Sequence, residues 1–532
     1  MTSVPATNPF LSHRGASLLA PANRIATHIS SAFKSLYSEE NPDGHISLGV
    51  AENWLMQEWL TKYFNSQFEL VPEDLHYQSV FGPNSFKLVL QDLLNKYFHP
   101  SIPVKSEHLV TGIGVTAVLE QLLYSLCDAN DRVLLAKPYY AGFDKIAKQK
   151  LGIVLVGVDV PEGIDPSSET ALESFESAYQ ETALESFELS YRALESQSLR
   201  DSVKCVLLCN PSNPLGFCYS RKALIEYLKF CERYNLHLIV DEIYAFSVFN
   251  PKTNLSLEET LENQTLTETT REFVSVLTID CLEEAGCDPG RLHVYAFKLL
   301  HRAGLLISQH NKEVINSVQS TANLMQIPRS TEVLLEKLLG NPTTLDWYLK
   351  EYVGESISRL NPYGYLFTRS KPKTKLQDAY EYSTKRLDAL KIEYLNSCAG
   401  HYIVVDLRRW LPEKTPNGIV LGTPIEREEA LFLTLLKDFG LYLFNLKLDF
   451  GQVQERSQLI RTTEDIRGTL QANVTSIETT ASPLYVVNSN GFMSSLKTFN
   501  SESRRMNTQL QVTPGHHHRH PSNEPLYIVN FV

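Results

Sequence analysis

Residues 205–216 read CVLLCNPSNPLG, and residues 236–244 read LHLIVDEIY. In the first stretch an apolar run of strand length meets two prolines and a glycine, which end regular structure, so a loop must follow the strand. Between the stretches, apolar residues recur at helical spacing after Ser220, a favourable helix cap. The second stretch is another buried strand, and it ends in Asp241. The sequence therefore predicts a βαβ unit with polar groups at one edge of a parallel sheet.

Three side chains at this edge share a chemical logic. An amide (Asn213), a carboxylate (Asp241) and a phenol (Tyr244) follow neighbouring strands and are suited to hold an aromatic heterocycle by its edge. The carboxylate would keep a ring nitrogen protonated. The alternatives are an acidic strand end of no function and a phosphate-hydrolysing site, but the sequence has no G-x-x-x-x-G-K-[ST] loop.

The motifs NPSNPLG and VDEIY resemble those of the fold type I pyridoxal-phosphate (PLP) enzymes, in particular class I/II aminotransferases and their 1-aminocyclopropane-1-carboxylate synthase-like branch. The resemblance implies that Asn213 and Tyr244 bind the 3-oxygen of the cofactor and that Asp241 pairs with its pyridine nitrogen. It also implies an amino-acid substrate and a homodimer. The implied fold is α/β: a large domain around a mostly parallel sheet of the seven-stranded type, and a smaller α+β domain from both chain ends.

A second strand-to-helix junction carries GIGVTA at residues 112–117. Backbone N–H groups at such a helix start form a natural phosphate cradle. The pattern also satisfies the G-x-G-x-x-A of dinucleotide folds, but that interpretation requires an acidic residue at the end of the next strand, and here the acids precede the strand. The resemblance instead assigns Val115 and Thr116 to the cofactor phosphate and Tyr140 to stacking on the pyridine ring. The alternative for Tyr140 is a loop aromatic that covers the sheet.

The lysine region departs from the family pattern. The family has S-x-S-K, a short loop and G-x-R-x-G after a strand, whereas residues 292–305 read LHVYAFKLLHRAGL, a shorter run without either serine. The resemblance implies that Lys298 forms the Schiff base and moves the α-proton, and that Arg302 binds the cofactor phosphate. An alignment without a gap would instead put Leu299 at the lysine position. Lys298 would then be a solvated lysine after a strand.

Further roles come from shorter matches. If one gap is allowed, the resemblance makes Tyr77 the tyrosine that reaches the phosphate of the partner subunit's cofactor; without the gap, Val80 takes that place and a donor is lost. The resemblance also implies substrate-binding roles for Glu52 in the segment GVAEN and for Asn396 in the segment NSCAG. Arg461 is the best candidate for the arginine that binds the substrate carboxylate in the family.

Composition limits the classes of function. A chain of 532 residues with 43% hydrophobic content can bury a large core in two or three domains. A net charge of −12 argues against nucleic acid as the main partner. The sequence has no apolar run of transmembrane length, and its start lacks the pattern of a signal peptide. Eight scattered cysteines without a C-x-x-C pair favour reduced core residues over metal ligands, so we expect no metal, no membrane and a cytoplasmic protein.

The predicted organisation follows from the motifs. The expected parts are an N-terminal arm at 1–44, the first part of the small domain with linking helices at 45–105, the large PLP-binding domain at 106–335, the C-terminal small domain at 336–450, and a divergent tail, either disordered or poorly packed, at 451–532.

The expected function is that of a PLP-dependent aminotransferase or 1-aminocyclopropane-1-carboxylate synthase-like lyase acting on an amino acid through a Schiff base, with secondary-metabolite biosynthesis as its setting. Two alternatives stay open. The shortened lysine loop favours a catalytically impaired protein of the PLP fold with a binding or dimerisation role. The other alternative is an NAD-dependent dehydrogenase.

Overall fold

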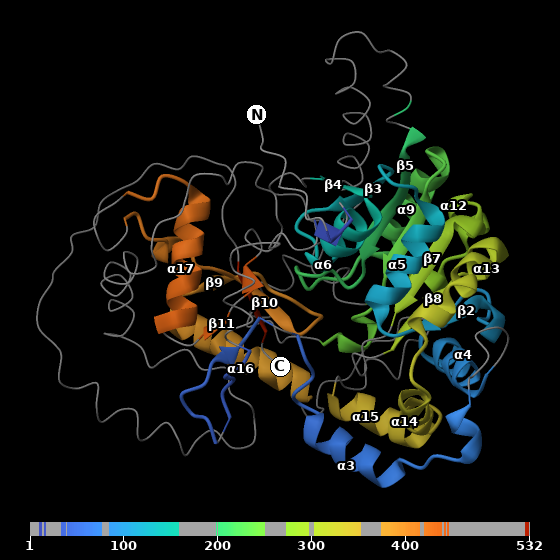
Figure 1. Ribbon diagram of the computed structural model, residues 1–532, viewed down its shortest axis with the longest axis horizontal. Helices are drawn as coiled ribbons and strands as arrows, with labels where there is room; N and C mark the ends of the chain where they lie inside the picture. Colours follow the sequence, from blue (N-terminus) through green and yellow to red (C-terminus); the bar gives the residue numbers. More distant parts are fainter. Residues whose placement is uncertain are drawn as a thin grey trace, which may run out of the picture. The chain divides into compact units, whose positions relative to one another are not determined.

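The computed structural model describes residues 10–12, 15–16, 33–38, 40–49, 51–76, 84–158, 198, 201–249, 273–296, 303–352, 374–414, 420–438, 441–442, 444–445 and 527–530. The chain divides into two compact units (Figure 1). The first comprises Met1–Ala22, Trp59–Glu381 and Leu395–Ile403, and the second comprises Asn23–Glu58, Tyr382–Tyr394 and Val404–Val532.

The first unit is built around a seven-stranded sheet of order β2-β8-β7-β6-β5-β3-β4. Its strands are β2 (Leu109–Gly112), β3 (Arg132–Ala136), β4 (Val154–Val158), β5 (Val203–Cys209), β6 (His237–Asp241), β7 (Leu292–Ala296) and β8 (Gly304–Ile307). Strands β4, β3, β5, β6 and β7 run parallel, and β8 is antiparallel to both of its neighbours. The predicted α/β fold with a mostly parallel seven-stranded sheet is confirmed.

Helices cover this sheet. Those of the first unit are α4 (Ser85–Tyr97), α5 (Val115–Leu126), α6 (Gly142–Asp144), α9 (Arg221–Arg233), α12 (Cys281–Ala285), α13 (Lys312–Ser320), α14 (Arg329–Leu339) and α15 (Pro342–Tyr352), while α3 (Gln57–Gln67) and α16 (Lys375–Ala389) each have residues in both units. Helix α5 contacts β2, β7 and β8, and α9 contacts β6 (Figure 1). The Ser220 side chain accepts a hydrogen bond from the Ala223 amide and caps α9, as its sequence predicts. The βαβ unit β5-α9-β6 is therefore present as predicted.

The second unit joins segments from both ends of the chain. Its strands are β1 (Ile46–Ser47), β9 (Glu393–Tyr394), β10 (Tyr402–Asp406, whose first residues belong to the first unit), β11 (Leu441–Tyr442), β12 (Phe444–Asn445) and β13 (Tyr527–Asn530), and its helix is α17 (Pro424–Asp438). Strand β1 pairs with β11, and the remaining strands form a sheet of order β12-β13-β10-β9. Strand β13 lies in the tail for which the sequence predicted disorder or poor packing.

The first unit continues beyond the predicted domain border at residue 335, because α14 packs on α4 and α15 and keeps the chain in this unit up to Glu381. The domain borders themselves stay predictions. None of the helices in the described part of the chain combines the length and apolar character that a bilayer crossing requires.

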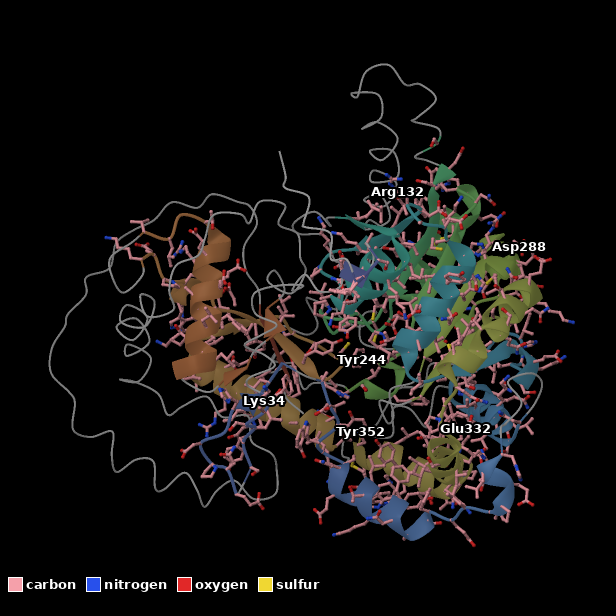
Figure 2. The ribbon with its side chains drawn as sticks, in the orientation of Figure 1. Lys34, Arg132, Tyr244, Asp288, Glu332 and Tyr352 are labelled. Carbon is pink, nitrogen blue, oxygen red and sulfur yellow. The ribbon has the colours of Figure 1, made fainter. Side chains whose placement is uncertain are left out.

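An ion cluster fastens α14 to the 3₁₀ turn Pro72–Leu75. Arg329 Nε lies 2.8 Å from Asp74 Oδ1, and Arg329 Nη1 lies 2.7 Å from Glu336 Oε1 and 3.3 Å from Glu332 Oε2. Glu332 is labelled in Figure 2. The side chains of Asp74 and Glu332 are less than one tenth exposed. Removal of the arginine would leave Asp74 and Glu336 without their cation, and Glu332 would keep only its interaction with the buried Lys87.

Arg329→Met should therefore lower the free energy of unfolding by about 3 to 5 kcal/mol, the usual loss when a buried ion pair keeps only one partner. Urea unfolding measures this change. The matched control is Lys96→Met, which breaks a pair with Asp346 whose side chains are both nearly half exposed, and which should cost about 1 kcal/mol or less. If the two variants lost the same free energy of unfolding, the ion cluster around Arg329 would not be more stabilising than an exposed ion pair.

Candidate active site

The site begins with three side chains that the strand register aligns. Asp241, the last residue of β6, is paired with Cys209 at the end of β5 and with Tyr295 in β7. Residues paired across strands point to the same face of a sheet. Cys209, Asp241 and Tyr295 therefore form one row, here called the strand-end row, across the carboxyl ends of three parallel strands. Open α/β sheets bind ligands at this edge.

Asp241 is 5% exposed, and its carboxylate interacts with the phenols of Tyr140, Tyr244 and Tyr295. Burial raises the pKa of Tyr140, of Tyr244 and of Tyr295, and the Asp241 carboxylate contributes to the increase in all three. Asp241 Oδ1 accepts a hydrogen bond of 3.0 Å from the Ile243 amide, which fixes the carboxylate at the end of its strand. The site therefore presents one acid among three phenol side chains.

Tyr140 lies on the loop after β3 and is 43% exposed. Its ring folds back over Gly142, where a Cβ atom would lie 2.2 Å from Tyr140 Cε1, so a larger residue at 142 would displace the ring. The ring of Phe143 packs edge-on against it at 5.5 Å. An exposed ring face fixed beside Asp241 is suited to cover a planar ligand.

Tyr244 is supported by residues far away in the sequence. Its ring contacts Tyr402 at 5.3 Å and His401 at 5.7 Å, both nearly edge-on. The Tyr402 hydroxyl donates to Ser212 O at 2.9 Å, and His401 Nε2 shares a hydrogen bond with the hydroxyl of Tyr352. Figure 2 labels Tyr244 and Tyr352. These contacts hold the phenol of Tyr244 in a fixed position.

The two motifs NPSNPLG and NSCAG, which are remote in the sequence, meet in the fold. Gly216 O accepts hydrogen bonds from the amides of Cys398 (2.7 Å) and Ala399 (3.1 Å). Gly216 has φ of 71°, and a Cβ atom there would lie 2.4 Å from Ser397 Cβ, so the contact requires glycine.

The loop that carries Asn213 is held by another asparagine. Asn210 is fully buried; its amide donates to Asp241 O at 2.8 Å, and its Nδ2 donates to Val274 O at 2.9 Å. Asn210 thus ties the loop to the end of β6. Asn213 lies further along the loop, is half-buried, and lines a cavity of about 20 Å³ together with Lys137. That volume suits a water molecule and not a substrate.

The predicted phosphate cradle is a helix start. Gly114, with φ of 82°, precedes α5, and Val115 and Thr116 are its first two residues. The first N–H groups of a helix have no acceptor within it and favour anions. A Cβ atom on Gly304 would lie 2.4 Å from Gly114 C, so β8 can pack against this loop only if residue 304 is glycine.

The other predicted site residues differ in what the structure says of them. Tyr77, Lys298, Arg302 and Arg461 lie outside the described residues. Glu52 is exposed in the second unit. Asn396 is exposed in the first unit and accepts a hydrogen bond of 3.4 Å from the Tyr380 hydroxyl. Their roles toward a substrate stay predictions.

The side chains of the site fit a pyridine cofactor. Asp241 suits the ring nitrogen, the Tyr244 phenol a ring oxygen and Tyr140 the ring face, and the start of α5 suits a phosphate. The Tyr295 hydroxyl is buried and has no hydrogen-bond partner among the described residues, so the row also holds an unused polar group. Sequence reasoning missed Tyr295, Tyr402 and Asn210.

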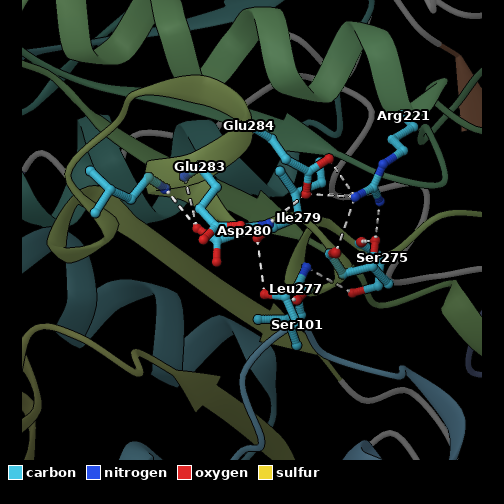
Figure 3. Close-up of polar contacts among 10 residues, drawn as sticks. Ser101, Arg221, Ser275, Leu277, Ile279, Asp280, Glu283 and Glu284 are labelled. Carbon is cyan, nitrogen blue, oxygen red and sulfur yellow. Dashed lines mark hydrogen bonds and ion pairs between the residues drawn. The ribbon is translucent and has the colours of Figure 1, made fainter.

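Glu242, the neighbour of Asp241 in the sequence, is held by hydrogen bonds. Its carboxyl group is 1% exposed and takes hydrogen bonds from Ser275 Oγ (2.7 Å) and the Val276 amide (2.8 Å). The segment that starts at Ser275 is itself fastened: Ser101 donates to Leu277 O and Ile279 O, and Arg221 bridges Thr278 and Glu284 (Figure 3). The position of Asp241 thus depends on a tethered neighbour.

Burial raises the pKa of Glu242 to about 8, although its bonds to Ser275 and Val276 act in the opposite direction. At a pH between the ordinary pKa of a glutamate and this raised pKa, Glu242 is protonated in the folded protein and ionised in the unfolded chain. Stability therefore falls as the pH rises through this window. Glu242→Gln removes the titration, so at pH 8 the variant should be more stable than the parent by about 2 to 4 kcal/mol, with little difference at pH 5.

Thermal and urea unfolding between pH 4.5 and 8 measure this difference. Glu69→Gln, which makes the same chemical change at an exposed position, is the matched control and should unfold like the parent. If the Glu242→Gln curve also ran parallel to that of the parent, the carboxyl group would be ionised in the folded protein.

Comparisons with known proteins show which proteins this chain resembles. The family model described as aminotransferase class I and II matches residues 69–271. The chain is 29% identical to "Probable aminotransferase aclI" of Aspergillus oryzae over 62% of its own length and 76% of that protein, and 29% identical to 1-aminocyclopropane-1-carboxylate synthase 8 of Arabidopsis thaliana over 72% and 74%. It is 28% identical to "Probable inactive 1-aminocyclopropane-1-carboxylate synthase-like protein 2" of Mus musculus over 76% and 62%.

Solved structures show the same fold. An archaeal alanine:glyoxylate aminotransferase superposes with a TM-score of 0.57 at 17% identity, covering 88% of this chain and 98% of that one. The aspartate aminotransferase of Thermus thermophilus with maleate superposes with a TM-score of 0.54 at 14% identity, covering 88% and 99%.

Proposed function

We propose that this chain is a member of the class I and II aminotransferase family and a PLP-dependent enzyme that acts at the amino group of an amino acid, as an aminotransferase or as a lyase of the 1-aminocyclopropane-1-carboxylate synthase kind. One observation carries the proposal. Asp241 is buried at the carboxyl end of β6 and its carboxylate interacts with the phenols of Tyr140, Tyr244 and Tyr295, at the edge where open α/β sheets bind ligands.

When bound, PLP supplies an electron sink for negative charge that develops on the substrate carbon. The residues of this chain would prepare it for that task. Asp241 would hold a proton at the pyridine nitrogen, and Tyr244 and Asn213 would bind the 3-oxygen. Tyr140 would cover the ring face. Val115 and Thr116, at the start of α5, would bind the phosphate through backbone N–H groups.

The remaining roles are proposed from the sequence resemblance. Lys298 would take the α-proton and return it, and Arg302 would pair with the cofactor phosphate. Arg461 would bind the substrate carboxylate, with Glu52 and Asn396 beside it. Tyr77 would reach the cofactor of a second copy, which makes a homodimer part of the proposal. The cytoplasmic location and the setting in secondary-metabolite biosynthesis are proposed on the same basis.

A second candidate is a protein of the same fold that has lost catalysis and acts in binding or dimerisation. Two observations favour it: the run around Lys298 is shorter than the family pattern, and one relative bears the name "Probable inactive". The third interpretation, an NAD-dependent dehydrogenase, has no support in the family match.

Amino-group chemistry tests the two candidates. The purified protein is given PLP, a 2-oxo acid and a panel of L-amino acids that includes members with a leaving group on the γ-carbon, and products are followed by mass spectrometry. The proposed function predicts amino transfer to the oxo acid or loss of the γ-substituent. Bound PLP without either product would favour the second candidate.

A further inference from the structure

Tyr295 has an uncommon environment. The residue is 1% exposed, and its hydroxyl has no hydrogen-bond partner among the residues that the structure describes. An unpaired buried hydroxyl destabilises a fold, and native proteins keep few of them. By contrast, the hydroxyl of Tyr402, also buried in this site, donates to Ser212 O at 2.9 Å. The side chain at position 295 therefore needs a reason beyond packing, because phenylalanine would fill the same space.

The position of Tyr295 suggests that reason. It lies beside Asp241 in the strand-end row, on the same face of the sheet. Burial raises the pKa of the Tyr295 hydroxyl, and the Asp241 carboxylate adds to this increase both through its charge and as a nearby hydrogen-bond acceptor. The hydroxyl and the carboxylate nevertheless do not meet regular hydrogen-bond geometry. The Ile243 amide already donates to Asp241 Oδ1. A donor is thus poised next to an acid that would face a cationic ring nitrogen.

We propose that Tyr295 is a positioning residue for Asp241: its hydroxyl donates to the carboxylate once a pyridine nitrogen has docked, and so keeps the acid ionised and oriented. The inference rests on the proposed function. A hydrogen bond to the charged form of a carboxylate favours that form. An ionised Asp241 in turn favours the protonated ring nitrogen. The hydroxyl would therefore strengthen PLP binding in the loaded protein, while it lowers the stability of the protein without PLP.

Tyr295→Phe tests this inference because the two states should respond in opposite directions. The empty variant should melt at the same temperature as the parent or higher, since an unpaired hydroxyl is gone. Its affinity for PLP, measured by fluorescence titration, should fall about tenfold, as expected for one charge-assisted hydrogen bond. With PLP labelled with ¹⁵N in the ring, the nitrogen signal should move toward its unprotonated position.

Tyr227→Phe is the matched control. Tyr227 is also 1% exposed, but it lies on α9 and packs against Tyr219. This variant should leave PLP affinity and the ¹⁵N signal unchanged. A merely structural role for Tyr295 would lower the melting temperature of its empty variant and leave the ¹⁵N signal where it is, and that result would overturn the inference.

The outcomes separate this inference from the function on which it rests. If the parent protein binds no PLP, the proposed function and the inference are both overturned. If the parent binds PLP and Tyr295→Phe binds it equally well with the same ¹⁵N signal, the function stands and the role of Tyr295 is overturned. Weaker binding with a shifted signal in Tyr295→Phe alone supports both.

Discussion

Asp241→Asn is expected to lower turnover by about 10²- to 10³-fold, the usual loss when one preorganised electrostatic group is removed from an active site. An amide carries no negative charge and cannot hold a proton at the pyridine nitrogen, so the electron sink weakens. The side chain keeps its shape, and its carbonyl oxygen can still accept the hydrogen bond from Ile243. Stopped-flow measurement of the amino-acid half-reaction determines the change.

The fold should tolerate this substitution far better than the chemistry does. The melting temperature of Asp241→Asn should remain close to that of the parent. Asp92→Asn makes the same chemical change at an exposed position on α4 and should leave both turnover and stability unaltered. Full turnover by Asp241→Asn with PLP bound would show that another group protonates the ring, and the role assigned to Asp241 would be wrong.

Lys298→Ala should have the largest effect, a loss of activity of about 10³-fold or more, because it removes the amine that we propose both attaches the cofactor and moves the α-proton. Borohydride reduction of the loaded parent followed by peptide mapping should find the cofactor mass on the peptide that contains Lys298. The variant should acquire no label. Lys312→Ala, at an exposed position on α13, should be labelled like the parent.

A label elsewhere would redirect the lysine assignment. Lys137 is the described lysine to compare, since it lines the small cavity together with Asn213 at the same edge of the sheet. Label on Lys137 in the parent, and its persistence in Lys298→Ala, would show that the shortened run after β7 does not supply the amine.

The sequence predicted the parts of the site that are encoded locally. Strand β5, helix α9 and strand β6 follow from periodicity, a serine cap and two prolines within one stretch. Asp241 and Tyr244 follow from the motif at the end of that stretch. The mostly parallel seven-stranded sheet was predicted from the family resemblance and not from local patterns.

Residues brought in by long-range contacts could not be predicted in this way. Tyr295 becomes part of the site through the register of β6 and β7, which no local pattern records. Tyr402 contacts Tyr244 across a long stretch of sequence. The segment before Tyr402 is held near the site by a hydrogen bond from the Cys398 amide to Gly216 O. The sequence also shows Asp241 and Glu242 as two equal acids, and only burial with the Ser275 tether distinguishes them.

The tail shows a limit of compositional reasoning. Its Ser, Thr and Asn content predicted disorder or poor packing, yet four of its last residues form β13 and pair with β12. The pairing partner lies far upstream, so a window on the tail alone could not reveal it.

The central claim is that a pyridine ring binds across the strand ends, held by Asp241, Tyr244 and Asn213. Titration of the purified protein with PLP tests it most directly, with the visible spectrum and the melting temperature recorded in the same samples. The account predicts a saturable absorbance band and a melting temperature that rises with PLP concentration. A colourless protein whose melting temperature is unchanged by excess PLP would contradict it.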